Sequence, residues 1–164
     1  MISSGNFWRT VISGLIATFV MTMIAFLQGG VGLPVIDVGH FLTQTFNHVH
    51  EGNPYSLLMG NTAYYGFGII LALIWVAFLQ QRTPGGWALQ GVIYGVLISL
   101  LSALVVSPLV SLAGGDSFGI LYLDTWVPGL VLLAGLLMHL GYGLSLMICL
   151  KVAGVEGVDS ESRS

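Results

Sequence analysis

The stretch WVPGLVLLAGLLMHLGYGLSLMICLKV, residues 126–152, decides the fold class because its only charged side chain, Lys151, lies next to its end. A helix needs roughly 20 mainly apolar residues to cross the hydrocarbon core of a bilayer. Three further uncharged runs have the same character: residues 11–28, 62–79 and 87–112. None shows the period-two alternation of a transmembrane β-barrel. The sequence therefore predicts an all-α integral membrane four-helix bundle, a single domain over residues 1–164.

The composition excludes the main classes of soluble protein. Of the 164 residues, 55% are hydrophobic and 7% are charged, whereas about a quarter are charged in an ordinary soluble domain. Four Lys and Arg residues are too few for a surface that binds nucleic acid. The single cysteine, Cys149, cannot form an intrachain disulfide. Lipid is therefore the first partner that the composition predicts.

The basic residues predict the orientation of the bundle. Arg9 precedes the first run, Arg82 lies between the second and third, and Lys151 and Arg163 lie at and beyond the end of the fourth. Residues 29–59 and 113–124 contain no Lys or Arg. Because cytoplasmic loops carry the excess of Lys and Arg, we expect both termini to be cytoplasmic. The small polar residues of 153–164 predict a flexible tail.

The first outer segment predicts a short amphipathic helix at the membrane surface, over about residues 37–51. Its polar face follows spacings of three or four and contains Asp37, His40, Gln44, His48 and Glu51. This stripe is either a solvated face or a weak zinc or copper site. Asp37 with His40, or His48 with Glu51, would then supply two ligands. The two histidines are too far apart along a helix to share one ion.

A faint internal duplication relates the two halves of the chain. Tyr64 to Gly68 reads YYGFG, and His139 to Gly143 reads HLGYG 75 positions later. Gly14 precedes Gly91 by 77 positions, as Thr22 precedes Ser99. Because both halves would begin inside, the pattern predicts two parallel two-helix repeats, with chance similarity as the alternative.

Short motifs in all four runs resemble a family of small prokaryotic four-span membrane proteins that contain a domain of unknown function. The motifs are GLIAT from Gly14 with Met21-Thr22, GLPVID from Gly32, SPL from Ser107, and HLGYG from His139. The resemblance implies a multi-pass protein of the prokaryotic cytoplasmic (inner) membrane, and it implies no activity. In that family a histidine often begins the second helix too. Here that position is Tyr64, which argues against a paired-histidine role.

Small residues predict where helices approach closely. Gly91, Gly95, Ser99, Ala103 and Ser107 recur every fourth position of the third run. Such ladders let helix backbones pack together in lipid. We expect the ladder to pack within the chain, against the first or the fourth helix, and the stripe of Gly14, Thr18 and Thr22 on the first helix is the natural facing surface. The alternative is a seam for another subunit or a second copy.

His139 is the candidate for intramembrane chemistry, because it lies near the predicted midplane of the fourth helix. The simplest role is a neutral imidazole bonded to Ser99 or to a backbone carbonyl. A proton or substrate relay and a haem ligand are the alternatives. Thr22 and Tyr64 are the other polar side chains expected near this depth.

The chain lacks phosphate loops, metalloprotease and redox cysteine motifs, and nucleophile elbows. We therefore expect no catalysis by this chain alone, and no cofactor is required. The first hypothesis is an accessory subunit of a larger membrane assembly, such as a respiratory or other oxidoreductase complex. The second is a stand-alone channel or carrier with a cavity near His139, Ser99, Thr22 and Tyr64. The third is a haem- or metal-binding membrane protein.

Overall fold

The computed structural model describes residues 4–49, 55–114 and 118–155. Within these ranges the chain is helical and contains no strand. The long helices are α1 (Ser4–Gly29), α3 (Ser56–Ile74), α4 (Trp87–Leu101) and α6 (Pro128–Val152). The short ones are α2 (Val38–Val49), α5 (Ser107–Gly114) and the 3₁₀ turn η3 (Ile120–Tyr122). Two π-helical turns, η1 (Trp75–Leu79) and η2 (Ser102–Val106), extend α3 and α4.

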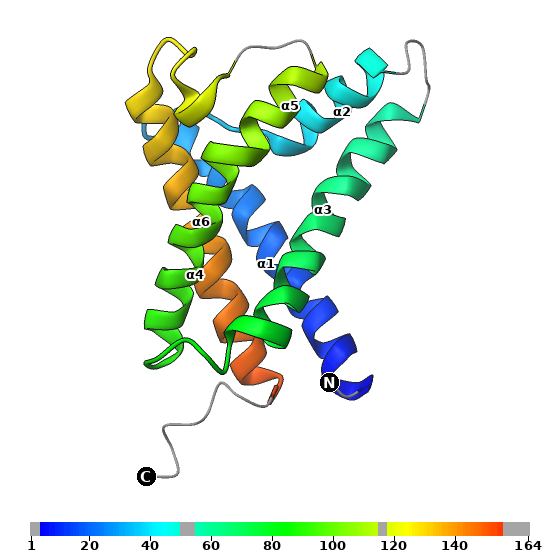
Figure 1. Ribbon diagram of the computed structural model, residues 1–164, viewed down its shortest axis with the longest axis vertical. Helices are drawn as coiled ribbons and strands as arrows, with labels where there is room; N and C mark the ends of the chain where they lie inside the picture. Colours follow the sequence, from blue (N-terminus) through cyan, green and yellow to red (C-terminus); the bar gives the residue numbers. More distant parts are fainter. Residues whose placement is uncertain (1–3, 50–54, 115–117, 156–164) are drawn as a thin grey trace.

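In the part of the chain that the structure describes, four helical stretches are long and apolar enough to cross a membrane: Ser4–Gly29, Ser56–Leu79, Trp87–Ala113 and Pro128–Val152. The start of α1 and the end of α6 lie at the same end of the bundle (Figure 1). We call this the inner end, because the basic residues predict that it faces the cytoplasm. The opposite end is the outer end.

Three predicted boundaries were wrong. The first helix begins at Ser4 and the second at Ser56, both earlier than the apolar runs, because a helix continues past the lipid-exposed part of its sequence. The fourth begins at Pro128, with Val127 at the N-cap position. Thr125 does not cap it, because its hydroxyl donates to the carbonyl of Tyr122 at 2.6 Å.

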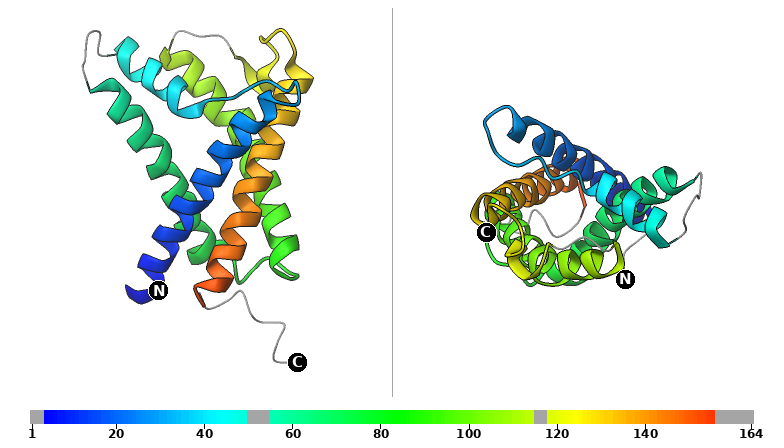
Figure 2. Two further views of the ribbon diagram at one scale, coloured as in Figure 1. Left: turned by 180° about the vertical axis from the view of Figure 1, so that it is seen from behind. Right: turned by 90° about the horizontal axis from the view of Figure 1, so that it is seen from above.

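Helix α6 lies between α1 and α4, and α1 lies between α6 and α3, so the spans pack in the order α4, α6, α1, α3. Helix α2 packs across α3 and α5 at the outer end (Figures 1 and 2). The most buried large side chains come mainly from α6, with Trp75 and Tyr94 from the peripheral helices. Many exposed apolar side chains on the outer faces of the spans are suited to lipid contact.

The irregular third span has a local cause. Pro108 has no N–H and its ring crowds the carbonyl four residues earlier, so the α-helical bonding cannot continue through this point. The chain forms the π-turn η2 directly before Ser107 and Pro108. The π-turn therefore interrupts the α-helical bonding of this span directly before the proline.

The predicted amphipathic helix is confirmed over Val38–Val49. Asp37 begins it, because its Oδ1 accepts a hydrogen bond from the backbone N–H of His40 at 2.9 Å. Thr43 lies so close to Gly60 that a Cβ there would clash with its backbone. Phe41 packs edge-on against Phe118, with 4.8 Å between ring centroids. These contacts fix α2 over the outer ends of α3 and α5.

Candidate functional site

Glycine contacts hold the spans in two close pairs. A Cβ on Gly14 would lie 3.1 Å from the Cα of Ile69 and 3.2 Å from the carbonyl oxygen of Gly68, so α1 packs directly on the backbone of α3. A Cβ on Gly91 would lie 3.0 Å from the carbonyl oxygen of Gly143, so α4 packs on α6 in the same way. These two contacts are equivalent under the offsets of the predicted duplication, which supports the repeat.

The small-residue ladder is buried within the chain over its whole length, from Gly91 through Gly95, Ser99 and Ala103 to Ser107. It faces α6, the fourth span, which is one of the two helices that we expected. A Cβ on Gly95 would lie 2.8 Å from the carbonyl oxygen of His139. The stripe of Gly14 and Thr18 faces Gly68 on α3 instead. The stripe on the first helix therefore does not face the ladder as we expected, because each glycine-rich hairpin packs on itself.

Polar side chains form hydrogen bonds in the interior of the bundle, both within a helix pair and from one pair to the other. Tyr64 on α3 is buried, and its hydroxyl lies 3.3 Å from the hydroxyl of Thr22 on α1. The predicted polar pair of the first two spans is thus brought together. One level further in, Tyr142 of α6 donates to the carbonyl of Gly68 at 2.6 Å.

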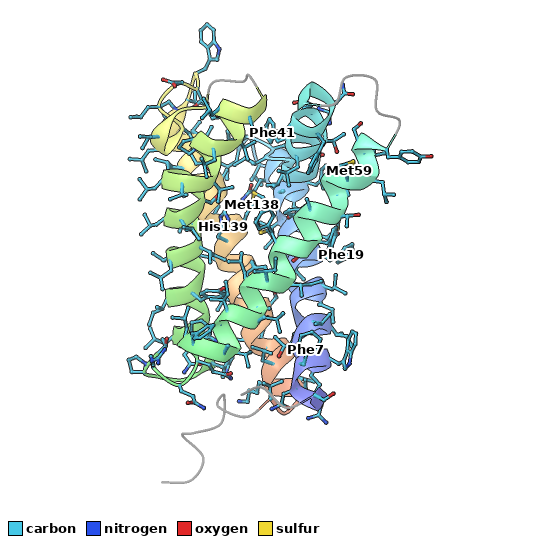
Figure 3. The ribbon with its side chains drawn as sticks, turned by 45° about the vertical axis from the view of Figure 1, so that its right-hand side comes forward. Phe7, Phe19, Phe41, Met59, Met138 and His139 are labelled. Carbon is cyan, nitrogen blue, oxygen red and sulfur yellow. The ribbon has the colours of Figure 1, made fainter. Side chains whose placement is uncertain are left out.

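His139 does not bond to Ser99. Its Nδ1 lies 2.6 Å from the carbonyl oxygen of Gly135 on its own helix, which is the backbone alternative that the sequence left open. Figure 3 shows His139 and Met138 near the middle of the length of the bundle. Ser99 lies under a shallow apolar groove of about 280 Å³ between α4 and α6, lined by Leu132, Leu133 and other apolar side chains. Ser99 therefore does not complete a site with His139.

Aromatic side chains continue the row toward the inner end. Tyr94 of α4 donates to the carbonyl of Leu71 on α3 at 2.6 Å. Its ring lies 4.6 Å from the ring of Trp75 and 6.3 Å from that of Tyr142. We name this set, from Thr22 and Tyr64 through Tyr142 and Tyr94 to Trp75, the polar column. Sequence reasoning missed Tyr94 and Tyr142, although a tyrosine in an apolar span needs a partner for its hydroxyl.

The outer end of the interior is covered by a strained turn. Leu121 and Tyr122 both have positive φ values, 55° and 58°, a conformation that non-glycine residues rarely adopt. The Tyr122 ring is buried at this turn, and a Cβ on Gly135 would lie 3.9 Å from its hydroxyl. Burial raises the pKa of Tyr122, and a hydrogen bond with Ser102 partly opposes that shift.

The weak metal candidates are not brought together in the described part of the chain, where no group of three His, Cys, Asp or Glu side chains could hold an ion. The Asp37 carboxylate caps α2, and His40 is exposed. The side chain of His48 and all of Glu51 lie outside the described residues. A metal site on this segment stays a prediction.

Comparison with known proteins gives one partial similarity. No family model matches the chain, and no solved structure matches it. The chain is 36% identical over 77 residues to GDP-fucose transporter 1 of Mus musculus. The match covers 45% of this chain and 20% of the transporter. The chain thus spans about a fifth of the length of the curated relative that it matches.

Proposed function

We propose that this protein is a membrane carrier or channel for a small neutral polar solute, which moves along the polar column between α3 and α4. The observation that carries the proposal is a row of hydroxyl and indole groups in the interior of an otherwise apolar bundle. Polar side chains inside a membrane protein are costly and tend to mark a pathway. The partial similarity to a transporter supports the same class of function.

The charges of the described spans favour a neutral solute. Their only charged side chains are Arg9, near the start of α1, and Lys151, near the end of α6. No cation or anion in the described interior would compensate a charged solute at mid-depth. The similarity to GDP-fucose transporter 1 therefore supports a transport function for this chain, but it does not support GDP-fucose as the solute.

Helix α3 is the element that we expect to move. It packs on α1 through Gly68 and Ala72, but it meets α4 and α6 through the hydroxyls of Tyr94 and Tyr142. Interhelical hydrogen bonds in membranes are individually weak, about 0.6 kcal/mol on average. Opening the α3 side of the column would break these two bonds and separate the buried Trp75 ring from Tyr94.

Reconstitution into liposomes tests the proposal. Stopped-flow light scattering would measure swelling with glycerol or urea, and with potassium chloride as the ionic comparison. We expect neutral solutes to enter faster than in protein-free liposomes and the salt to remain excluded. Equal rates with and without protein for every neutral solute would refute the proposal.

A second candidate is the accessory subunit of a larger membrane assembly. A groove of about 400 Å³ between α1 and α3 supports it, because it is lined by Leu15, Tyr65 and Ile69 on the face exposed to the bilayer. Gly66 borders this groove, and a Cβ there would meet nothing within 4 Å. Purification in a mild detergent with mass spectrometry of co-eluting chains tests this function. A partner at stoichiometric yield would favour it over a stand-alone carrier.

A further inference from the structure

We propose that Trp75, Gln80 and Gln90 form a binding site for a small neutral molecule that both donates and accepts hydrogen bonds. The site lies at the inner end of the polar column, beside the turn that joins α3 to α4. The inference rests on the proposed function, since it assigns the place where the solute is held before it enters or leaves the column.

A π-turn brings the site together. In η1 the backbone N–H of Gln80 donates to the carbonyl of Trp75 at 2.8 Å, five residues earlier. The extra residue in this turn places Gln80 beneath Trp75, on the same inward side of the span. In an α-helix the bonded residue would be Leu79, and Gln80 would be rotated away. Both Trp75 and Gln80 are fully buried, at 0% and 1% exposure.

The facing helix supplies the other half. Gln90 lies one turn of α4 before Tyr94, and Tyr94 contacts Trp75. Gln90 is 3% exposed, and its Nε2 donates to the carbonyl of Thr83 in the α3–α4 turn at 2.9 Å. The two glutamines therefore lie in one layer, next to the aromatic pair and nearer the inner end.

The polar atoms of this cluster are unpartnered among the described residues. They are the indole Nε1 of Trp75, both amide atoms of Gln80 and the Oε1 of Gln90. Buried polar atoms in native proteins nearly always have a hydrogen-bond partner, and leaving one without a partner is unfavourable. Four such atoms on neighbouring turns indicate a bound partner. At the outer end Gln28 also keeps an unpartnered Oε1, while its Nε2 donates to the carbonyl of Ala134, so it adds one such atom far from this cluster.

The donor set defines the chemistry of the ligand. The indole N–H can only donate, the free Gln90 oxygen can only accept, and Gln80 can do both. No member carries a charge. A neutral amide or hydroxyl compound matches this set, whereas an inorganic ion does not.

Tryptophan quenching tests the site directly. A variant with Trp8→Phe, Trp87→Phe and Trp126→Phe keeps Trp75 as its sole tryptophan, which is excited selectively at wavelengths where tyrosine no longer absorbs. Acrylamide is a neutral amide that quenches tryptophan, iodide is an anionic quencher, and acetamide is a matching amide that does not quench. In nanodiscs we expect acrylamide quenching that saturates and is relieved by acetamide, and no quenching by iodide. Quenching that rises linearly and ignores acetamide would mean that acrylamide collides with the indole without binding, and an absence of quenching would mean that the amide does not reach the cluster. Either result would overturn the proposal.

Gln80→Leu provides the matched variant. We expect it to abolish the saturable quenching and to raise Tm by a few degrees, because two unpartnered polar atoms are removed from a buried position. Gln28→Leu is the control: it removes a bonded Nε2 and an unpartnered Oε1 outside the site, so it should leave the saturable quenching intact. If Gln80→Leu retained saturable quenching, the site assignment would be wrong.

Circular dichroism and a monodisperse elution profile establish that each variant folds. As a second measurement, Trp75→Phe in the otherwise unchanged chain must remove the saturable component. Because binding is measured without transport, saturable quenching in a protein that passes no solute would refute the proposed function and not this site. Solute entry without saturable quenching would refute this site and leave the proposed function standing.

Discussion

At the scale of single residues, the interior of this bundle is organised by hydrogen bonds to backbone carbonyls. His139 uses a carbonyl of its own helix, while Tyr94 and Tyr142 use carbonyls of α3. A backbone carbonyl has two lone pairs, so it can accept a side-chain donor while keeping its helical bond. An apolar span can therefore hold polar side chains without matching polar side chains on its neighbours.

The bond of His139 predicts a modest structural role. His139→Gln keeps a side-chain donor and should unfold at nearly the wild-type SDS fraction. His139→Leu loses the bond to Gly135 and should cost about 0.6 kcal/mol, the average for bonds of this kind. Reversible unfolding in SDS measures both variants. If the glutamine variant were as unstable as the leucine variant, the imidazole would have a further partner that glutamine cannot replace.

The tyrosine hydroxyls predict how firmly α3 is held. Tyr94→Phe and Tyr142→Phe each remove one bond to α3 and should each cost about 0.6 kcal/mol, with about 1.7 kcal/mol as the upper bound. Because the centroids of the two rings lie 6.3 Å apart, the double variant should depart from the sum, and the difference measures the coupling between the two bonds. Tyr65→Phe, at the α1–α3 groove, is the control and should leave stability unchanged. Steric trapping of α3 against α6 measures the differences.

At the scale of helices, glycine positions set the pairing. In lipid there is no hydrophobic drive for helices to associate, so the closest fit of backbones decides which helices pair. Gly14 brings α1 onto α3, while Gly91 and Gly95 bring α4 onto α6. The pairing follows from which small residues lie opposite each other.

A pair of alanine substitutions tests that pairing. A Cβ on Gly95 would lie 2.8 Å from a backbone oxygen that cannot move without shifting α6, so Gly95→Ala should destabilise by about 1–3 kcal/mol. Gly66→Ala meets nothing within 4 Å and should be neutral or slightly stabilising, because alanine favours the helix. Thermal unfolding in the same detergent compares the two. If Gly95→Ala and Gly66→Ala changed stability equally, the backbones of α4 and α6 would have to lie further apart than the structure places them.

At the scale of the whole molecule, the distribution of basic residues predicts the orientation. In a Cys149→Ala background, Val31→Cys near the outer end of α1 should react with an impermeant maleimide in intact cells. Gln81→Cys in the α3–α4 turn should react only after the membrane is opened. Both positions are exposed, so their reactivity reports the side of the membrane. Labelling of Gln81→Cys in intact cells would reverse the orientation.

Hydropathy alone determined the class of this protein, its spans and the surface helix, because these depend on the side chains of consecutive residues. Asp37 is a clear case: it was predicted at the start of the amphipathic segment, and the fold uses it as the cap of α2. The candidate pair of Thr22 and Tyr64 was also accessible, since the two residues were expected near the same depth.

Only the tertiary structure decided which helices touch and what each polar group bonds to. The ladder on α4 faces α6 and not α1, and His139 turns to Gly135 and not Ser99. The position of Gln80 beneath Trp75 depends on a π-turn that no local pattern predicts. The physical reason is the same in each case. In a bilayer the energy differences between alternative helix pairs come from close packing and from single hydrogen bonds, which depend on residues far apart in the sequence.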